Sequence, residues 1–198
     1  MNEAMTTVAV HEQPASTRSL DHRKLGMWLF LATEVMLFSS LIAGFLDMRF
    51  RSPAGANHVL NIPITAVNTF VLICSSLMVV LAIASIEEGN QKRLRNFLML
   101  TFLFGATFLS VQIIEYSHLI GSGELTPWNN LFGAGFFTVT GFHGFHVFIG
   151  LIWCALTILW TQRGEFSAHD FMRVEMFGLY WHFVDVVWIV LFTIIYLL

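Results

Sequence analysis

The sequence predicts an all-helical integral membrane protein, a bundle of five transmembrane helices. Its 198 residues are 56% hydrophobic and only 12% charged, with a mean hydropathy of +0.70. Soluble domains carry about twice this share of charged residues. The sequence also holds five apolar stretches, each reaching the roughly 20 residues that a helix needs to cross the hydrocarbon core. A soluble bundle would need polar faces on these stretches, and they have none.

Short polar segments separate the apolar stretches and mark their limits. The stretches comprise residues Leu25–Leu46, Ile64–Ile86, Phe97–Ile120, Leu131–Trp160 and Met176–Leu198. Arg23 and Lys24 precede the first, and Pro63 precedes the second. Gly89 follows the second and can take the left-handed conformation that ends a helix. None of the segments between the stretches is long enough to form a domain, so we expect a single transmembrane domain over residues 25–198.

The charged residues predict how the bundle is oriented. Residues 1–24 form a polar tail without the apolar core of a secretory signal. This tail and the segments 87–96 and 161–175 share one side, and they hold eight of the ten Lys and Arg residues, with Arg49 and Arg51 on the other. The positive-inside rule therefore places the N-terminus inside and the C-terminus outside. Cys74 and Cys154 both lie in apolar stretches, so we expect no disulfide and interpret both as small apolar packing groups.

Seven ionisable side chains lie inside the apolar stretches, and none of them is Lys or Arg. They are Glu34, Glu115, His118, His143, His146, His182 and Asp185. A charged group at the centre of a bilayer costs about 2.5–3.5 kcal/mol on insertion scales, so each is a candidate functional residue. They can bind a metal, move protons, or join helices, subunits and lipids.

Two pairs of these residues, each with members three positions apart, resemble metal-binding motifs. Glu115 and His118 form an E-x-x-H unit, but a di-iron site needs two such units and two further carboxylates. His143 and His146 can ligate a metal or a haem from one helix face. Gly144 lies between them, however, and with Gly105, Gly141 and Gly150 it indicates close approach of helices. We therefore favour histidines hydrogen-bonded across a helix interface over metal ligation.

Two carboxyl groups are expected near the middle of the membrane. Asp185 lies three residues after His182, so it can pair with this histidine within the helix or with a neighbouring helix. Glu34 has only Thr33 and Ser39 as polar neighbours in the sequence. We therefore expect Glu34 to be an isolated carboxyl that is protonated or serves an ion, a proton or a lipid headgroup.

Several strings resemble subunit III of the haem–copper cytochrome oxidases. The most specific are Gly141-Phe-His-Gly-Phe-His-Val147 and Tyr180-Trp-His-Phe-Val-Asp-Val-Val-Trp188. Thr33-Glu-Val-Met-Leu-Phe38 is similar to the acidic segment of that family, and Asn68-Thr-Phe-Val-Leu72 and Glu115-Tyr116 follow in the family's order. The resemblance runs from about Leu25 to the last residue and fits the short, five-helix bacterial form.

The resemblance implies a subunit of cytochrome c oxidase that carries no redox centre of its own. Haem and copper then belong to partner subunits I and II, and this chain would have no catalytic or metal-binding residue and would bind no nucleic acid. It would stabilise subunit I, bind phospholipid and support proton uptake, as a multi-pass protein of the bacterial inner (plasma) membrane. A larger respiratory supercomplex is a further candidate partner. Glu34 and His146 would serve lipid or protons. A polar core would comprise Glu115, His118, His143, His146, His182 and Asp185.

Three alternatives remain open at this stage. The chain could be a membrane metalloprotein with its own di-metal or haem centre, or the related accessory subunit of nitric oxide reductases. The electron donor of an oxidase could also be a quinol. Gly141-Phe-His-Gly144 resembles the cytochrome c branch more than the Gly-Thr-His-Gly of quinol oxidases, which favours cytochrome c.

The predicted orientation can be tested at the C-terminus. Alkaline phosphatase fused after Leu198 should be active, because this enzyme folds only outside the cytoplasm, and a green fluorescent protein at the same place should stay dark. The opposite pair of results would show that the topology is inverted.

Overall fold

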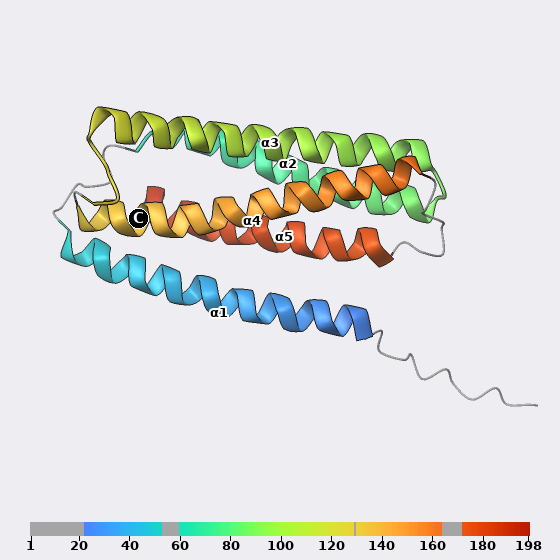
Figure 1. Ribbon diagram of the computed structural model, residues 1–198, viewed down its shortest axis with the longest axis horizontal. Helices are drawn as coiled ribbons and strands as arrows, with labels where there is room; N and C mark the ends of the chain where they lie inside the picture. Colours follow the sequence, from blue (N-terminus) through green and yellow to red (C-terminus); the bar gives the residue numbers. More distant parts are fainter. Residues whose placement is uncertain (1–21, 53–59, 129, 164–171) are drawn as a thin grey trace, which may run out of the picture.

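The structure, a computed structural model, describes residues 22–52, 60–128, 130–163 and 172–198. Its long helices are α1 (His22–Arg51), α2 (Ile62–Glu87), α3 (Gln91–Ser122), α4 (Leu131–Gln162) and α5 (Met172–Phe192), and a π-helical turn, η2 (Thr193–Leu197), continues α5. The helices run side by side along one axis (Figure 1). All five are long and apolar enough to cross a membrane, and the described residues form no strand. The predicted all-helical class with five transmembrane helices is confirmed.

Several helices extend beyond the predicted apolar stretches. α1 begins at His22 and includes Arg23 and Lys24, which were assigned to the tail. α3 begins at Gln91 and α5 begins at Met172, both before the predicted start. The reason is that hydropathy marks only the hydrocarbon part of a helix, whereas capping residues mark its end. Most of the predicted tail, residues 1–21, lies outside the described residues.

Asparagine caps and glycine turns define the helix ends that hydropathy did not predict. Asn61, Asn90 and Asn130 stand before α2, α3 and α4, and each side chain accepts the backbone N–H three residues further on, at 3.3, 3.1 and 2.6 Å. Gly89, between α2 and α3, has φ 74°, the left-handed conformation predicted for it. Gly123 ends α3 with φ 70°.

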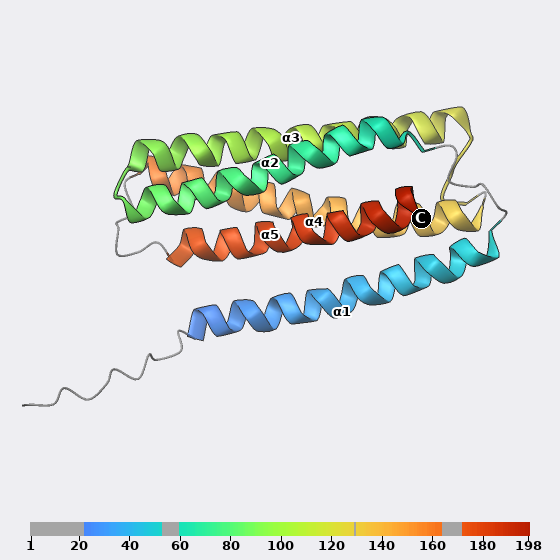
Figure 2. The same cartoon turned by 180° about the vertical axis from the view of Figure 1, so that it is seen from behind.

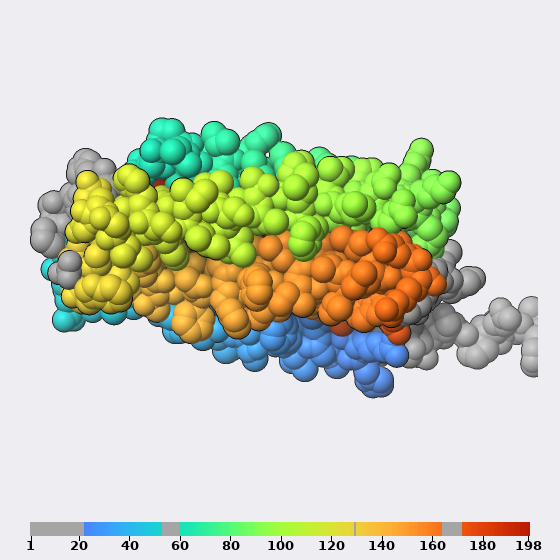
Figure 3. Space-filling view, turned by 45° about the horizontal axis from the view of Figure 1, so that its top comes forward, coloured from blue at the N-terminus to red at the C-terminus, as the bar shows by residue number. Residues whose placement is uncertain are grey.

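The five helices form a compact group of four with α1 at its edge. α2 and α3 pack as a hairpin, α4 packs on α3, and α5 lies against both α2 and α4 (Figures 1 and 2). α1 lies on the far side from this hairpin, against α4 and α5. Figure 3 shows α3 and α4 side by side, with α1 emerging beyond α4. Only 17% of the most apolar part of α1 is buried, against 50% for α5, so α1 is the most exposed helix.

Trp181 of α5 sets how closely α3 and α4 approach. Its ring would lie 2.7 Å from a Cβ atom added at Gly105 and 2.8 Å from one added at Gly150, so both positions must be glycine. These two predicted approach points are confirmed. Gly141 has nothing within 4 Å and Gly144 meets only Leu109 at 3.7 Å, so the prediction of close contact at these two was wrong.

Polar contacts near its two ends hold α1 against α5. Lys24 forms an ion pair with Glu175 at one end. At the other, Arg49 Nη1 donates a hydrogen bond to the Ile194 carbonyl oxygen of η2 at 2.6 Å. Cys74 and Cys154 are free thiols, as predicted.

Candidate functional site

Glu34 of α1 and His146 of α4 form a hydrogen bond about midway along the two helices. Glu34 Oε2 lies 3.1 Å from His146 Nε2, and the two side chains are 14% and 10% exposed. Phe38 packs edge-on against the imidazole, with ring centroids 5.1 Å apart. The expectation of an isolated Glu34 was therefore wrong. Its partner is 112 positions away, so no local spacing in the sequence could reveal it.

The hydrogen bonds of His146 restrict how many protons the pair can hold. Nδ1 lies 2.8 Å from the Phe142 carbonyl oxygen, which can only accept, so Nδ1 carries a proton. A hydrogen bond between Nε2 and Glu34 then needs one further proton, on either the imidazole or the carboxyl group. In both forms the pair is neutral overall, which suits a low-dielectric environment. The pair can thus pass a proton from one group to the other without changing its net charge.

His143 lies one helical turn before His146 and has a structural environment. Its Nε2 donates to the Val184 carbonyl oxygen of α5 at 3.1 Å, and its side chain is fully enclosed. The ring packs against Trp188 at 4.8 Å and edge-on to Phe108 at 5.9 Å. The interpretation of His143 and His146 as histidines hydrogen-bonded across helix interfaces is confirmed.

His182 and Asp185 do not pair with each other. His182 Nδ1 lies 2.6 Å from Ser76 Oγ of α2, so this histidine bonds to a neighbouring helix. Asp185 is 6% exposed, and its Oδ1 atom has no hydrogen-bond partner among the described residues. The intrahelical pair fails because the imidazole ring of His182 is directed at Ser76.

Two tryptophans of α5 form interhelical bonds that the sequence analysis missed. Trp181 Nε1 donates to Ser75 Oγ and Trp188 Nε1 donates to Thr69 Oγ1, both at 2.9 Å. Both acceptors are on α2. An indole N–H in hydrocarbon needs a partner, so two tryptophans seven residues apart facing a Ser/Thr-containing helix were an available signal.

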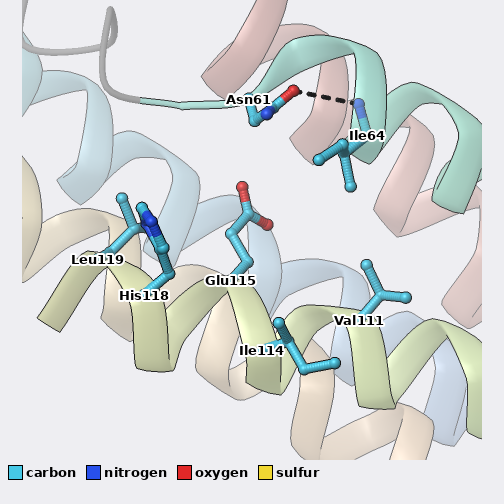
Figure 4. Close-up of a pocket in the computed structure, with 7 residues that line it drawn as sticks. All are labelled: Asn61, Ile64, Val111, Ile114, Glu115, His118 and Leu119. Carbon is cyan, nitrogen blue, oxygen red and sulfur yellow. Dashed lines mark hydrogen bonds between the residues drawn. The ribbon is translucent and has the colours of Figure 1, made fainter. Parts of the chain in front are cut away.

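Glu115 and His118 line a cavity between α3 and the start of α2, but they do not bond to each other. Glu115 accepts a long hydrogen bond from the Tyr196 hydroxyl at 3.3 Å, and Thr65 Oγ1 lies 3.4 Å from its carboxyl group. His118 is exposed. Figure 4 shows both side chains projecting from α3 toward Asn61. The structure therefore brings the predicted polar residues to separate interfaces and not to one common core.

The chemistry available to these residues is hydrogen bonding and proton exchange. Among the described residues, no three His, Cys, Asp or Glu side chains lie close enough together to hold a metal ion. Many buried Ser and Thr side chains instead donate to a carbonyl oxygen of their own helix, whereas Asn68 and His143 bond to a carbonyl oxygen of a neighbouring helix. The Glu34–His146 pair is the described site best suited to holding a proton.

The contact between His182 and Ser76 can be tested by substitution. Ser76→Ala should lower the free energy of unfolding by about 0.6 kcal/mol and by no more than about 1.7 kcal/mol, the average and the largest value found for hydrogen bonds between membrane helices. Ser39→Ala is the matched control, because Ser39 is exposed and bonds only to the Val35 carbonyl oxygen of its own helix. Unfolding of the detergent-solubilised protein in a denaturing detergent measures the difference. Equal stability of the two variants would contradict the contact.

The sequence of the chain was compared with protein families and with known proteins. The family model described as cytochrome c oxidase subunit III matches residues 6–198. Cytochrome c oxidase subunit 3 of Thermostichus vulcanus is 38% identical over 98% of this chain and 94% of its own length. Cytochrome bo(3) ubiquinol oxidase subunit 3 of Pseudomonas putida is 37% identical over 88% of this chain and 84% of its own. Quinol oxidase subunit 3 of Bacillus subtilis is 32% identical over 88% of this chain and 86% of its own length.

The family model covers nearly the whole chain, and so do relatives above 30% identity. Together with five helices able to span a membrane, these matches show that the chain is a multi-pass membrane protein that belongs to the cytochrome c oxidase subunit III family of haem–copper oxidases.

Proposed function

We propose that this chain is the non-redox third subunit of a cytochrome c oxidase in a bacterial inner membrane. It would pack beside subunits I and II, which would carry the haem and copper, and it would stabilise subunit I. Within this assembly it would bind phospholipid and help to supply protons. The family membership supports the assembly, and the hydrogen bond between Glu34 and His146 carries the more specific role.

The Glu34–His146 pair is suited to holding a proton near a partner subunit. It is only partly enclosed, with side chains 14% and 10% exposed, and it lies between the edge helix α1 and α4. A shift of its proton from carboxyl to imidazole leaves the net charge unchanged. The pair can therefore hold a proton in hydrocarbon without the desolvation cost of an isolated charge.

An apolar cavity between α1 and α5 supports phospholipid binding. It has a volume of about 380 Å³ and lies between α1 and α5, where Trp28, Val35, Phe183 and Val186 are among its lining residues. α1 contacts the bundle less than the other helices do, so an acyl chain can fill this space in the membrane. We propose that a bound lipid seals α1 against α5 next to Glu34.

Substitution of Glu34 separates a supporting role from an obligatory proton-carrying one. In Glu34→Gln the amide can still donate to His146 Nε2, so the oxidase complex should inactivate at close to the normal rate during turnover. Glu34→Ala leaves Nε2 unpaired and opens a small void, and the complex should inactivate several-fold faster with an unchanged haem spectrum. The measurement is the activity lifetime of the purified complex in an oxygen electrode.

Met36→Ala is the control, because Met36 is on the same helix and is 73% exposed. It should behave like the wild type. If both Glu34 variants abolished the first turnover, Glu34 would be an obligatory proton carrier and the supporting role would be wrong.

The electron donor is a separate part of the proposal, and a quinol is the second candidate. Relatives named for cytochrome c and for ubiquinol match this chain at 38% and 37% identity, so overall similarity does not separate them. The Gly141-Phe-His-Gly144 string is the feature that favours cytochrome c.

The oxidation rates of the co-purified complex distinguish the two electron donors. The complex isolated through a tag on this chain should contain a larger haem-bearing subunit and should oxidise reduced cytochrome c at least tenfold faster than a ubiquinol analogue. Faster oxidation of the quinol would assign the chain to a quinol oxidase. Isolation without any haem protein would contradict the assembly itself.

A further inference from the structure

Two adjoining cavities between α2 and α3 form a groove with one polar end and one apolar end. The first has a volume of about 280 Å³, and its polar lining residues are Asn61, Glu115 and His118 (Figure 4). The second has a volume of about 390 Å³ and an almost wholly apolar lining. Ile64 and Val111 line both cavities, so the two adjoin each other. We call the two together the α2–α3 groove.

The polarity of the groove follows the polarity of one leaflet of a bilayer. Asn61 immediately precedes α2, and His118 lies in the last turns of α3, so the polar end is at the ends of the helices. The apolar end follows α2 from Pro63 to Val71, about 12 Å at the rise of an α-helix. A phospholipid in the membrane has the same arrangement, with its headgroup at the boundary and its acyl chains toward the centre.

Glu115 has capacity for a further hydrogen-bond donor. Its contacts with the Thr65 and Tyr196 hydroxyls are 3.3–3.4 Å long, whereas O–H···O hydrogen bonds are usually 2.5–3.0 Å. The single hydrogen of the Thr65 hydroxyl is donated to the Asn61 carbonyl oxygen at 3.0 Å, so Tyr196 is the donor to Glu115. No ion pair among the described residues involves Glu115, although Lys or Arg pairs with Asp47, Glu88 and Glu175. The groove thus presents a carboxyl group with no cation among the described residues to pair with it.

The other two polar residues at this end provide donors. Asn61 Oδ1 accepts the Ile64 N–H at 3.3 Å, and its Nδ2, which carries two hydrogens, bonds to none of the described residues, so it can donate to a ligand. Figure 4 shows this nitrogen on the side of Asn61 that faces Glu115 and His118. His118 follows Glu115 by one helical turn and is exposed at the mouth of the cavity. Glu115, which can accept hydrogen bonds from a cationic group, therefore lies beside Asn61 and His118, which can donate hydrogen bonds to an anionic group.

We propose that the α2–α3 groove binds phosphatidylethanolamine. The primary ammonium group would donate to Glu115, the phosphate would accept from Asn61 and His118, and one acyl chain would occupy the apolar cavity. A choline headgroup has no N–H to donate, and a glycerol headgroup has no cation for Glu115. This site is on α2 and α3, apart from the cavity between α1 and α5, and it depends only on the chain's position in a membrane.

Native mass spectrometry of the intact, delipidated oxidase complex tests the headgroup contact. Phosphatidylethanolamine should bind about tenfold more tightly than phosphatidylcholine, a difference of about 1.4 kcal/mol. Glu115→Gln should remove this preference, because the amide cannot pair with the ammonium group by charge. Glu124→Gln is the matched control, since Glu124 is an exposed acid at the same end of the bundle. It should keep the preference.

A second variant tests the acyl-chain end without touching the carboxylate. Val67 is 66% exposed and lines the apolar cavity, so Val67→Trp should fold and should weaken binding of both lipids at this site. Equal binding of the two lipids to the wild-type complex would overturn the proposal, as would equal effects of Glu115→Gln and Glu124→Gln. Unchanged lipid binding in Val67→Trp would overturn the placement of the acyl chain.

Discussion

The absence of water from the hydrocarbon core is the constraint on which the rest of this structure depends. A polar side chain there must bond within the protein, so each bond between helices also fixes where the two helices meet. Trp188 reaches Thr69, and His143 reaches the Val184 carbonyl oxygen. Asn68 Nδ2 of α2 donates to the Phe108 carbonyl oxygen of α3 at 3.1 Å. These bonds join α2, α3, α4 and α5 into one unit.

α1 is held to the other helices by fewer polar contacts. Its ends are held by the Lys24–Glu175 ion pair and by the bond from Arg49 to the Ile194 carbonyl oxygen. Between them, the Glu34–His146 hydrogen bond is the described polar contact that fixes α1 to α4. The least buried helix therefore carries one of the mostly buried carboxyl groups, at the edge of the bundle. On the function proposed above, stability and proton supply would both depend on this pair of residues.

The sequence predicts the fold more completely than the site. The number of helices and the candidate polar residues follow from hydropathy, because few charges are tolerated in a membrane segment. The partner of a polar residue depends on helix rotation and on register between helices, and packing sets both. Trp181 against Gly105 and Gly150 is an example, since it fixes the level at which α5 meets α3 and α4. The bond between Glu34 and His146 depends on packing of this kind.

The pairs at i, i+3 show why spacing alone was insufficient. Such spacing places two side chains on one helix face, but it does not make them contact each other. His182 bonds to Ser76, and Glu115 accepts from Tyr196, so both motifs are used between helices. A residue in hydrocarbon bonds to whichever polar group the neighbouring helix presents.

A double-mutant cycle between Glu34 and His146 tests the central claim most directly, because it isolates the energy of one bond between helices. The free energy of unfolding would be measured for Glu34→Ala, His146→Ala and the double variant. A coupling energy of about 0.6–1.7 kcal/mol is predicted, with the double variant less destabilised than the sum of the two single variants. Strictly additive effects would contradict the claim, because they would mean that the interaction energy between the two side chains is zero.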